Sequence, residues 1–224
     1  MHKFKKTAVI LMIFVLPTIA IGQEKEFKKV KELIDKNLKE TVNTNDFIIT
    51  IRKIFTLSQD LKGNYPESPL GYYASSFYFE RTNINVDSAF FQMKIANDQF
   101  NKLDEKNQQK LCDKFNLCKE TFTNNLDSLS VISLANYCSN QRSDEVKKFL
   151  NKYPQGIESY NIALQIYEKL RFREILQSND LNLYSKFFIE FPNSKYSDSL
   201  NAKIEQLIIM FCQGVPIGLI LRTI

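Results

Sequence analysis

Apolar residues recur every three or four positions along most of this 224-residue chain, which is the spacing of amphipathic helices. The pattern predicts an all-α fold of about nine to ten helices. Helices this short are marginal alone in water, so we expect packing as antiparallel pairs to stabilise them. The predicted helices span residues 24–40, 45–61, 70–81, 86–103, 105–115, 119–138, 143–152, 157–176, 180–191 and 194–207.

One motif, with the pattern F-[LF]-x-x-[YF]-P-x-[GS], occurs twice with a spacing of 38 residues. Each copy reads as the end of a helix, a proline that stops it, and a small or polar residue that can cap the next helix. We expect the prolines just past helix ends and the aromatic residues buried between helices. The first copy contains Phe149, Leu150, Tyr153, Pro154 and Gly156, and the second contains Phe187, Phe188, Phe191, Pro192 and Ser194.

A third and more divergent copy of the motif lies at residues 64–69. Helical repeats of this length are typical of an α-solenoid, in which each helix pair buries its apolar face against its neighbours. The sequence therefore predicts a repeat domain over residues 44–207, preceded by a lead-in helix within residues 23–43.

The motif resembles the joint between repeats in tetratricopeptide-like proteins. It is most similar to exported members, such as outer-membrane assembly lipoproteins of the BamD kind and the periplasmic Tol-Pal accessory proteins. The resemblance covers residues 140–207 and 44–103, where the Asp87, Ala89 and Phe90 pattern also looks like the start of a repeat helix. It implies a protein-protein scaffold. The chain departs from the tetratricopeptide pattern in two ways. Its period is 38 rather than 34 residues, and paired small residues at helix contacts are scarce.

Both ends of the chain differ from the repeats. Lys3, Lys5 and Lys6 precede an apolar run over residues 8–16, followed by small residues up to Gly22, which predicts a signal peptide over residues 1–22. The apolar run is too short to span a membrane, which takes about 20 residues. We expect an exported protein, periplasmic or extracellular, with no membrane span in the mature chain. Residues 208–224 form an apolar tail that either packs on the last helix as a cap or marks a truncated chain.

The composition of the mature chain excludes several classes of function. Removing residues 1–22 takes away the single histidine and three of the 30 Lys and Arg residues, which leaves 27 against 25 Asp and Glu. A net charge near +2 without clustered Lys and Arg does not provide the basic surface that nucleic-acid binding needs. The sequence contains no nucleophile motif, phosphate-binding glycine loop or C-x-x-C pair. We therefore expect no catalytic, metal-binding or cofactor-binding residues, and no enzyme.

The segment 70–81 carries more aromatic residues than one packing face needs. Burial on two sides is the first interpretation, and a face left for a partner is the second. The candidate partner-binding residues are Tyr72, Tyr78 and Phe79. The partner is expected to be an envelope protein, and the alternative is an extended peptide or a glycan that stacks on these rings.

Three cysteines are candidates for a disulfide, because export permits one. Cys112 and Cys118 would lie too far apart on one continuous helix, so a bond between them requires the helix to end near Asn116. Cys138 offers Cys118 a second partner across a helical hairpin. The remaining alternative is that all three are buried thiols.

Overall fold

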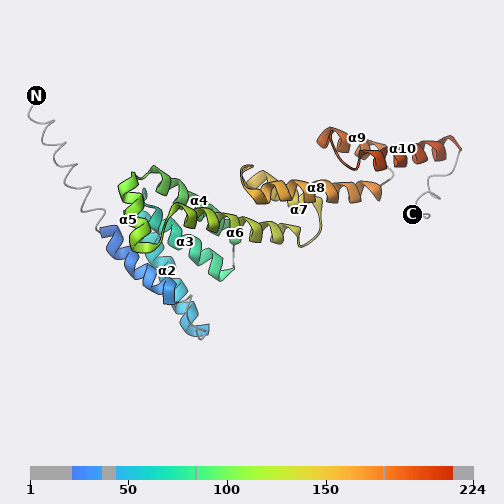
Figure 1. The fold of residues 1–224 in the computed structure, drawn as a ribbon. Coiled ribbons are helices and arrows are strands. Elements are labelled where there is room, and N and C mark those ends of the chain that lie inside the picture. Colours follow the sequence, from blue (N-terminus) through green and yellow to red (C-terminus); the bar gives the residue numbers. More distant parts are fainter. Residues whose placement is uncertain (1–21, 37–43, 84, 179, 214–224) are drawn as a thin grey trace, which may run out of the picture. The chain divides into compact units, whose positions relative to one another are not determined.

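The computed structural model describes residues 22–36, 44–83, 85–178 and 180–213, and these residues form helices and the turns between them, with no strand. The all-α fold predicted from the sequence is confirmed. Residues 1–21, which contain nearly all of the predicted signal peptide, lie outside the described residues, as does Leu38 of the predicted lead-in helix. A helix over residues 22–36 is followed by α2 (Thr44–Asn64), α3 (Pro69–Thr82), α4 (Val86–Lys102), α5 (Glu105–Phe115), α6 (Lys119–Cys138), α7 (Ser143–Lys152), α8 (Glu158–Leu176), α9 (Leu181–Glu190) and α10 (Ser197–Cys212) (Figure 1).

The chain divides into two units, Met1–Ser133 and Leu134–Ile224, with the boundary inside α6. The sequence pattern instead predicts a single repeat domain over residues 44–207. In the N-terminal unit, α3 packs against both α2 and α4. In the C-terminal unit, α7 packs against α8, and α9 packs against α8 and α10.

Small residues allow α3 to approach its two neighbours closely. Gly71, Ala74, Ser75 and Ser76 are all buried on this helix. A Cβ atom at Gly71 would lie 2.8 Å from the backbone nitrogen of Lys62, so α2 and α3 are in backbone contact there. The scarcity of small contact residues inferred from the sequence is therefore wrong for this helix.

Buried serines hold α3 to both neighbouring helices. The hydroxyl groups of Ser58 on α2 and Ser75 on α3 share a hydrogen bond of 2.9 Å. On the other side, the Ser76 hydroxyl donates to the backbone carbonyl of Ala89 on α4 at 2.7 Å. These bonds satisfy polar groups that would otherwise be costly to bury.

The helix over residues 22–36 is part of the N-terminal core. Its apolar stripe of Phe27, Val30 and Ile34 is buried, as the 3.6-residue period predicts. The Phe27 ring packs edge-on against Phe115 of α5 with centroids 5.0 Å apart, and contacts Tyr73 of α3. These contacts join the predicted lead-in helix to α3 and α5.

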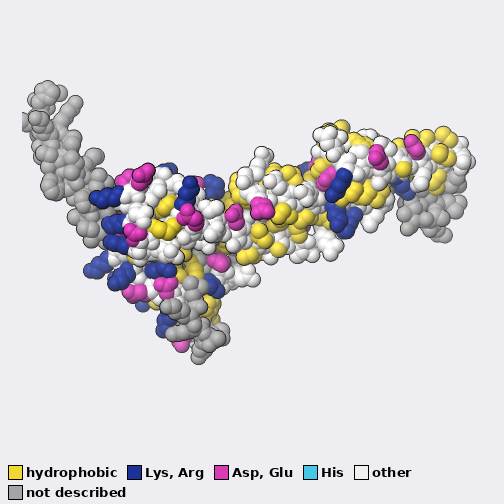
Figure 2. Space-filling model, viewed as in Figure 1, with side chains coloured by type: hydrophobic (Ala, Val, Ile, Leu, Met, Phe, Trp, Pro, Cys, Tyr) yellow, Lys and Arg dark blue, Asp and Glu magenta, His cyan; other side chains and the backbone are white. Residues whose placement is uncertain are grey.

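Ion pairs also join this first helix to α5. Glu24 accepts bonds from Lys110 and from Lys114, the latter at 2.7 Å. Burial alone would raise the pKa of Glu24, but the two lysines outweigh it and hold that pKa below its ordinary value. Elsewhere on this unit, Lys, Arg, Asp and Glu side chains are interspersed rather than gathered by sign (Figure 2).

The C-terminal unit contains two helix pairs of similar construction. In each pair a helix of 10 residues precedes a longer one, of 19 residues in α8 and 16 in α10. A buried cluster lies where α8 meets the second pair, with Ile175 from α8, Tyr184 and Phe187 from α9, and Leu200 and Leu207 from α10. The second pair thus shares a core with the helix before it.

Two local predictions for this unit are wrong. The side chain of Ser143 predicts that this residue is the N-cap of α7. Arg142 occupies that position instead, and Ser143 is the first helical residue. Its N–H and hydroxyl group instead donate to the Glu174 carboxylate of α8, at 3.0 and 2.6 Å. The last helix begins at Ser197 rather than Ser194, and it continues through Cys212, so the first five residues of the predicted tail are helical.

Candidate functional site

The proline joints predicted from the repeated motif share one backbone hydrogen bond, although the backbone angles of their C-cap residues differ. The Tyr153 N–H donates to the Phe149 carbonyl at 2.9 Å, and the Phe191 N–H donates to the Phe187 carbonyl at 2.8 Å. Both aromatic residues are the C-caps of their helices, α7 and α9. Pro154 and Pro192 follow directly, so both prolines lie just past helix ends as predicted.

The third copy of the motif forms the same joint between α2 and α3. The Tyr65 N–H donates to the Leu61 carbonyl at 2.8 Å, and Pro66 follows. The chain then reaches Ser68, whose hydroxyl accepts a bond from the Leu70 N–H and caps α3, with Pro69 as the first helical residue. The joint therefore occurs once in the N-terminal unit and twice in the C-terminal unit.

Of the motif's aromatic residues, three are buried as predicted, and Phe188 and Phe191 are only partly buried. Phe149 and Phe187 are completely buried, and Tyr153 is nearly so. Tyr153 stacks on Phe149 with ring centroids 4.1 Å apart. Phe191 is only partly buried, because it ends α9 beside the surface, although its ring still contacts Phe187 at 4.9 Å.

A polar cluster around Glu190 connects the two pairs of the C-terminal unit. Glu190, the last residue of α9, accepts a hydrogen bond of 2.5 Å from the Tyr167 hydroxyl of α8. Lys147 of α7 lies 3.3 Å from the same carboxylate, and the Arg171 Nε of α8 lies 3.6 Å from it. Three residues from α7 and α8 thus converge on one acid of α9.

The pKa values in this cluster follow from its contacts. Burial alone would raise the pKa of Glu190, but hydrogen bonds from Tyr167 and Lys147 outweigh it, so the pKa lies below its ordinary value. The pKa of Tyr167 is raised, first by burial and then by its bond to Glu190. Hydrogen bonds to Tyr167 and Glu190 raise the pKa of Lys147. The carboxylate is therefore held in its charged form.

The structure does not bring the three candidate partner-binding residues of α3 into one cluster. Tyr78 and Phe79 contact each other and Phe55 of α2, with the Tyr78 and Phe55 centroids 4.4 Å apart. Tyr72 lies beside Lys62, whose ammonium nitrogen is 5.8 Å from the ring centroid. All of these rings are partly buried, so each combines packing against α2 with some exposed surface.

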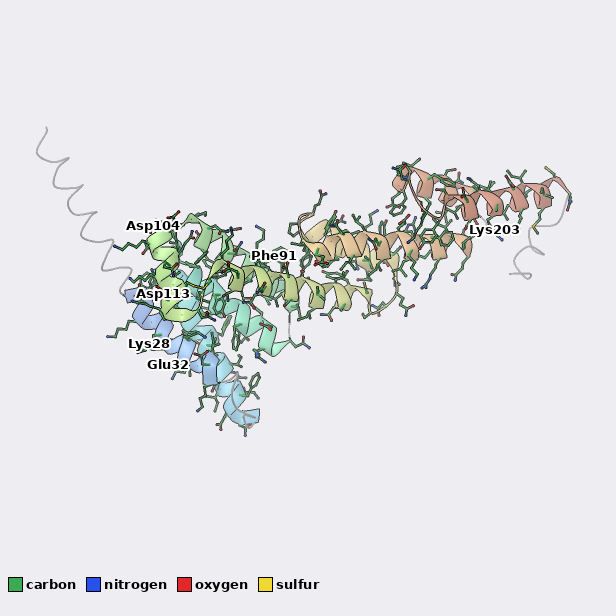
Figure 3. All side chains as sticks on the ribbon, in the orientation of Figure 1. Lys28, Glu32, Phe91, Asp104, Asp113 and Lys203 are labelled. Carbon is green, nitrogen blue, oxygen red and sulfur yellow. A yellow bond between two sulfur atoms is a disulfide. The ribbon has the colours of Figure 1, made fainter. Side chains whose placement is uncertain are left out.

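A groove of about 590 Å³ lies at the joint between α2 and α3. The turn before α5 forms its other wall, with Asp104 at the start of that helix (Figure 3). The Asp104 carboxylate is the N-cap of α5, since it accepts a hydrogen bond of 2.8 Å from the Asn107 N–H. Apolar side chains that line the groove are Tyr65, Pro66, Pro69, Leu103 and Leu111.

Cys112 and Cys118 form a disulfide, with Cα atoms 4.5 Å apart. The condition set by the sequence is met, because α5 ends at Phe115 and Asn116 adopts a left-handed conformation with φ 56°. This turn brings the chain back toward Cys112. Cys138 and Cys212 are free thiols, so the alternative pairing of Cys118 with Cys138 does not occur.

Within the described residues, no group of three His, Cys, Asp or Glu side chains is placed to hold a metal ion. In the same part of the chain, no helix is both long enough and apolar enough to cross a membrane. No family model, curated protein or solved structure matches the chain. A proposal about function therefore depends on the residues and their geometry.

Two features of the structure were not predicted, and only one of them carries a signal in the sequence. In the sequence, Glu190 cannot be distinguished from an ordinary surface residue, because its partners Lys147 and Tyr167 lie 43 and 23 residues away. The close packing of α3 does carry a signal in the sequence, because small residues between Gly71 and Ser76 in an otherwise aromatic helix indicate close helix contacts.

Proposed function

We propose that the chain is an exported helical-repeat scaffold, tetratricopeptide-like in construction, that binds another protein of the cell envelope. The observation that carries this proposal is the repeated joint. One hydrogen bond, one aromatic residue and one proline recur at Tyr65, Tyr153 and Phe191, each between two helices. Stacked helix pairs provide area and shape rather than reactive groups, and such surfaces serve to bind extended partners.

The disulfide supports the exported location. Disulfides persist in oxidising compartments and are rare in the reducing cytosol. The Cys112–Cys118 bond closes a loop between α5 and α6, in a chain whose first residues have the pattern of a signal peptide. Two independent features, one local to residues 112–118 and one at the N-terminus, thus favour the same compartment.

The partner-binding surface is proposed to include the aromatic residues shared by α2 and α3. Phe55, Tyr78 and Phe79 form a ring cluster that is only partly buried, and Ile48 and Ile49 are exposed on the same α2 helix. Partly exposed Tyr and Phe contribute large contact area with few rotatable bonds. The same rings favour the second candidate function, binding of an extended peptide or glycan by stacking.

Photo-cross-linking in the envelope tests the proposal. A photoreactive residue replaces Ile49, which is 65% exposed, and the matched control carries it at Ile189, which is 81% exposed on α9. We expect a discrete cross-linked protein from position 49 and none of the same mass from position 189. A glycan or small peptide adduct from position 49 would favour the second function, and no adduct from either position would contradict both.

A further inference from the structure

The helices from α5 to α10 follow one sequence period. A short helix of 10 or 11 residues, α5, α7 or α9, precedes a longer one, and the longer helices have 20, 19 and 16 residues. The N-cap residues of the three short helices are spaced by 38 residues, and they are Asp104, Arg142 and Asp180. The period of the motif therefore extends back to α5.

A further copy of the joint, without its proline, lies between α5 and α6. At the same spacing of 38 residues, Leu111 takes the place of Phe149, and both side chains are buried. Phe115 takes the place of the aromatic residue that ends the short helix, and Asn116 takes the place of the proline. This copy lacks the residue that stops the helix at the other joints.

The disulfide supplies what the proline supplies elsewhere. Cys112 and Cys118 stand at the second and last positions of the motif, and neither proline nor glycine lies between them. Asn116 permits a left-handed turn but does not impose it, because asparagine also occurs within helices. The bond does impose it, since cysteines six positions apart on one continuous helix are too far apart to bridge.

This joint positions the rings on which the first helix packs. Phe115, before the turn, contacts Phe27 of the helix over residues 22–36, with ring centroids 5.0 Å apart. After the turn, Phe122 of α6 is completely buried and contacts Tyr73, which in turn contacts Phe27. The rings on both sides of the bond therefore belong to one cluster with Phe27.

We propose that the Cys112–Cys118 bond is a redox switch for the first helix. The oxidised joint holds residues 22–36 on α5, and reduction releases them. A dithiol reductant breaks the S–S bond, each sulfur gains one electron and one proton, and the reductant becomes a disulfide. Without the bond, α5 is no longer forced to end before Cys118, so Phe115 loses its fixed place against Phe27. The proposal does not rest on the envelope role, because it concerns the bond and its contacts.

The switch also acts on the groove of about 590 Å³. Gln23 and Glu24 of the first helix line it together with Lys110 and Leu111 of α5. Glu24 and Lys110 form an ion pair, so the two helices are joined at the edge of the groove. Release of the first helix therefore removes one wall of the groove.

Hydrogen exchange followed by mass spectrometry, with and without a dithiol reductant, tests the proposal. In the purified chain, Cys138→Ser with Cys212→Ser leaves the bridged pair as its only cysteines. We expect the amides of residues 24–36 to exchange about tenfold faster after reduction, while those of α3, held between α2 and α4, keep their rate. An unchanged rate in the first helix, or an equal acceleration in α3, overturns the proposal.

A variant that gives this joint the sequence of the motif tests the equivalence directly. Cys112→Leu, Asn116→Pro and Cys118→Gly together supply the Leu, Pro and Gly of the first motif copy. We expect residues 24–36 of this variant to be as protected as in the oxidised chain, with or without reductant. The matched control, Cys112→Ser with Cys118→Ser, should exchange as the reduced chain does. A triple variant no more protected than this control contradicts the switch.

Discussion

The Tyr167 hydroxyl donates a hydrogen bond of 2.5 Å to the Glu190 carboxylate, and so connects the long helix of one pair to the end of the next pair's short helix. The residues lie 23 positions apart on α8 and α9. Beside this bond, the Tyr167 ring contacts Phe191 with centroids 5.5 Å apart. The proline joint and the contact between pairs therefore meet at one place, where α9 ends.

Replacing Glu190 with Gln should remove a contribution to the free energy of unfolding that is present at neutral pH and absent in acid. The folded pKa of Glu190 is below the ordinary value of 4.5, so its contribution is fully present above that pH and is lost as the pH falls through the lowered pKa. Urea unfolding across pH 2 to 7, a range that brackets the titration of carboxyl groups, should show wild type and variant converging in acid. Glu205→Gln on α10 is the control, and a constant wild-type to Glu190→Gln difference at all pH values would contradict this role.

Replacing Phe187 with Ala should destabilise the C-terminal unit strongly. The side chain is completely buried in the cluster of α8, α9 and α10, and truncation of such a residue costs about 3 to 5 kcal/mol. The matched change Ile189→Ala, two positions along α9 at an exposed site, should stay within about 0.5 kcal/mol. Denaturant unfolding measures both, and equal effects would show that the register of α9 is wrong.

Two glycine substitutions should have opposite signs. At Gly71 an added methyl group meets the Lys62 backbone nitrogen at 2.8 Å and the Leu61 Cβ at 3.1 Å, so Gly71→Ala forces α2 and α3 apart. We expect a loss of about 1 to 3 kcal/mol. Gly63 has open space around a Cβ and lies within α2, so Gly63→Ala should stabilise by about 0.5 to 1 kcal/mol. Thermal unfolding distinguishes them, and stabilisation by both changes would rule out the close contact.

The disulfide should be worth about 2 kcal/mol, because it closes a short loop in the unfolded chain. Mass spectrometry after alkylation without reductant should show two modified cysteines, Cys138 and Cys212, and four after reduction and unfolding. Cys112→Ser should lower stability by the same amount, whereas Cys138→Ser should not. Alkylation of all four cysteines without reductant would show that the bond does not form.

Local signals predicted the helices that have explicit starts and stops. The two ends of α5 follow from Asp104 and Asn116, and the end of α7 follows from Pro154, because the chemistry of these residues acts within a few positions of the chain. The helix α10 was predicted to end at Leu207 because the polar face disappears there. It continues to Cys212, since the first helix-breaking residue in the sequence is Gly214.

Contacts between distant residues could not be predicted in the same way. Ser143 has a side chain typical of an N-cap residue, but its N–H donates a hydrogen bond to the Glu174 carboxylate, 31 residues away. Only the packing of α7 on α8 brings these two residues together. Tyr78 and Phe79 are candidate partner-binding residues in the sequence because the segment 70–81 carries more aromatic residues than one packing face needs. Their contact with Phe55 depends on how closely α2 approaches α3, which Gly71 sets.

The most direct test of the account is the N-terminal sequence of the protein recovered from the periplasmic fraction of an expressing bacterium. An exported repeat scaffold should begin at Gln23, because cleavage after Gly22 removes the signal peptide. Recovery from the cytosol of a chain that still carries His2 and has free Cys112 and Cys118 thiols would contradict the proposed location, and with it the envelope partner.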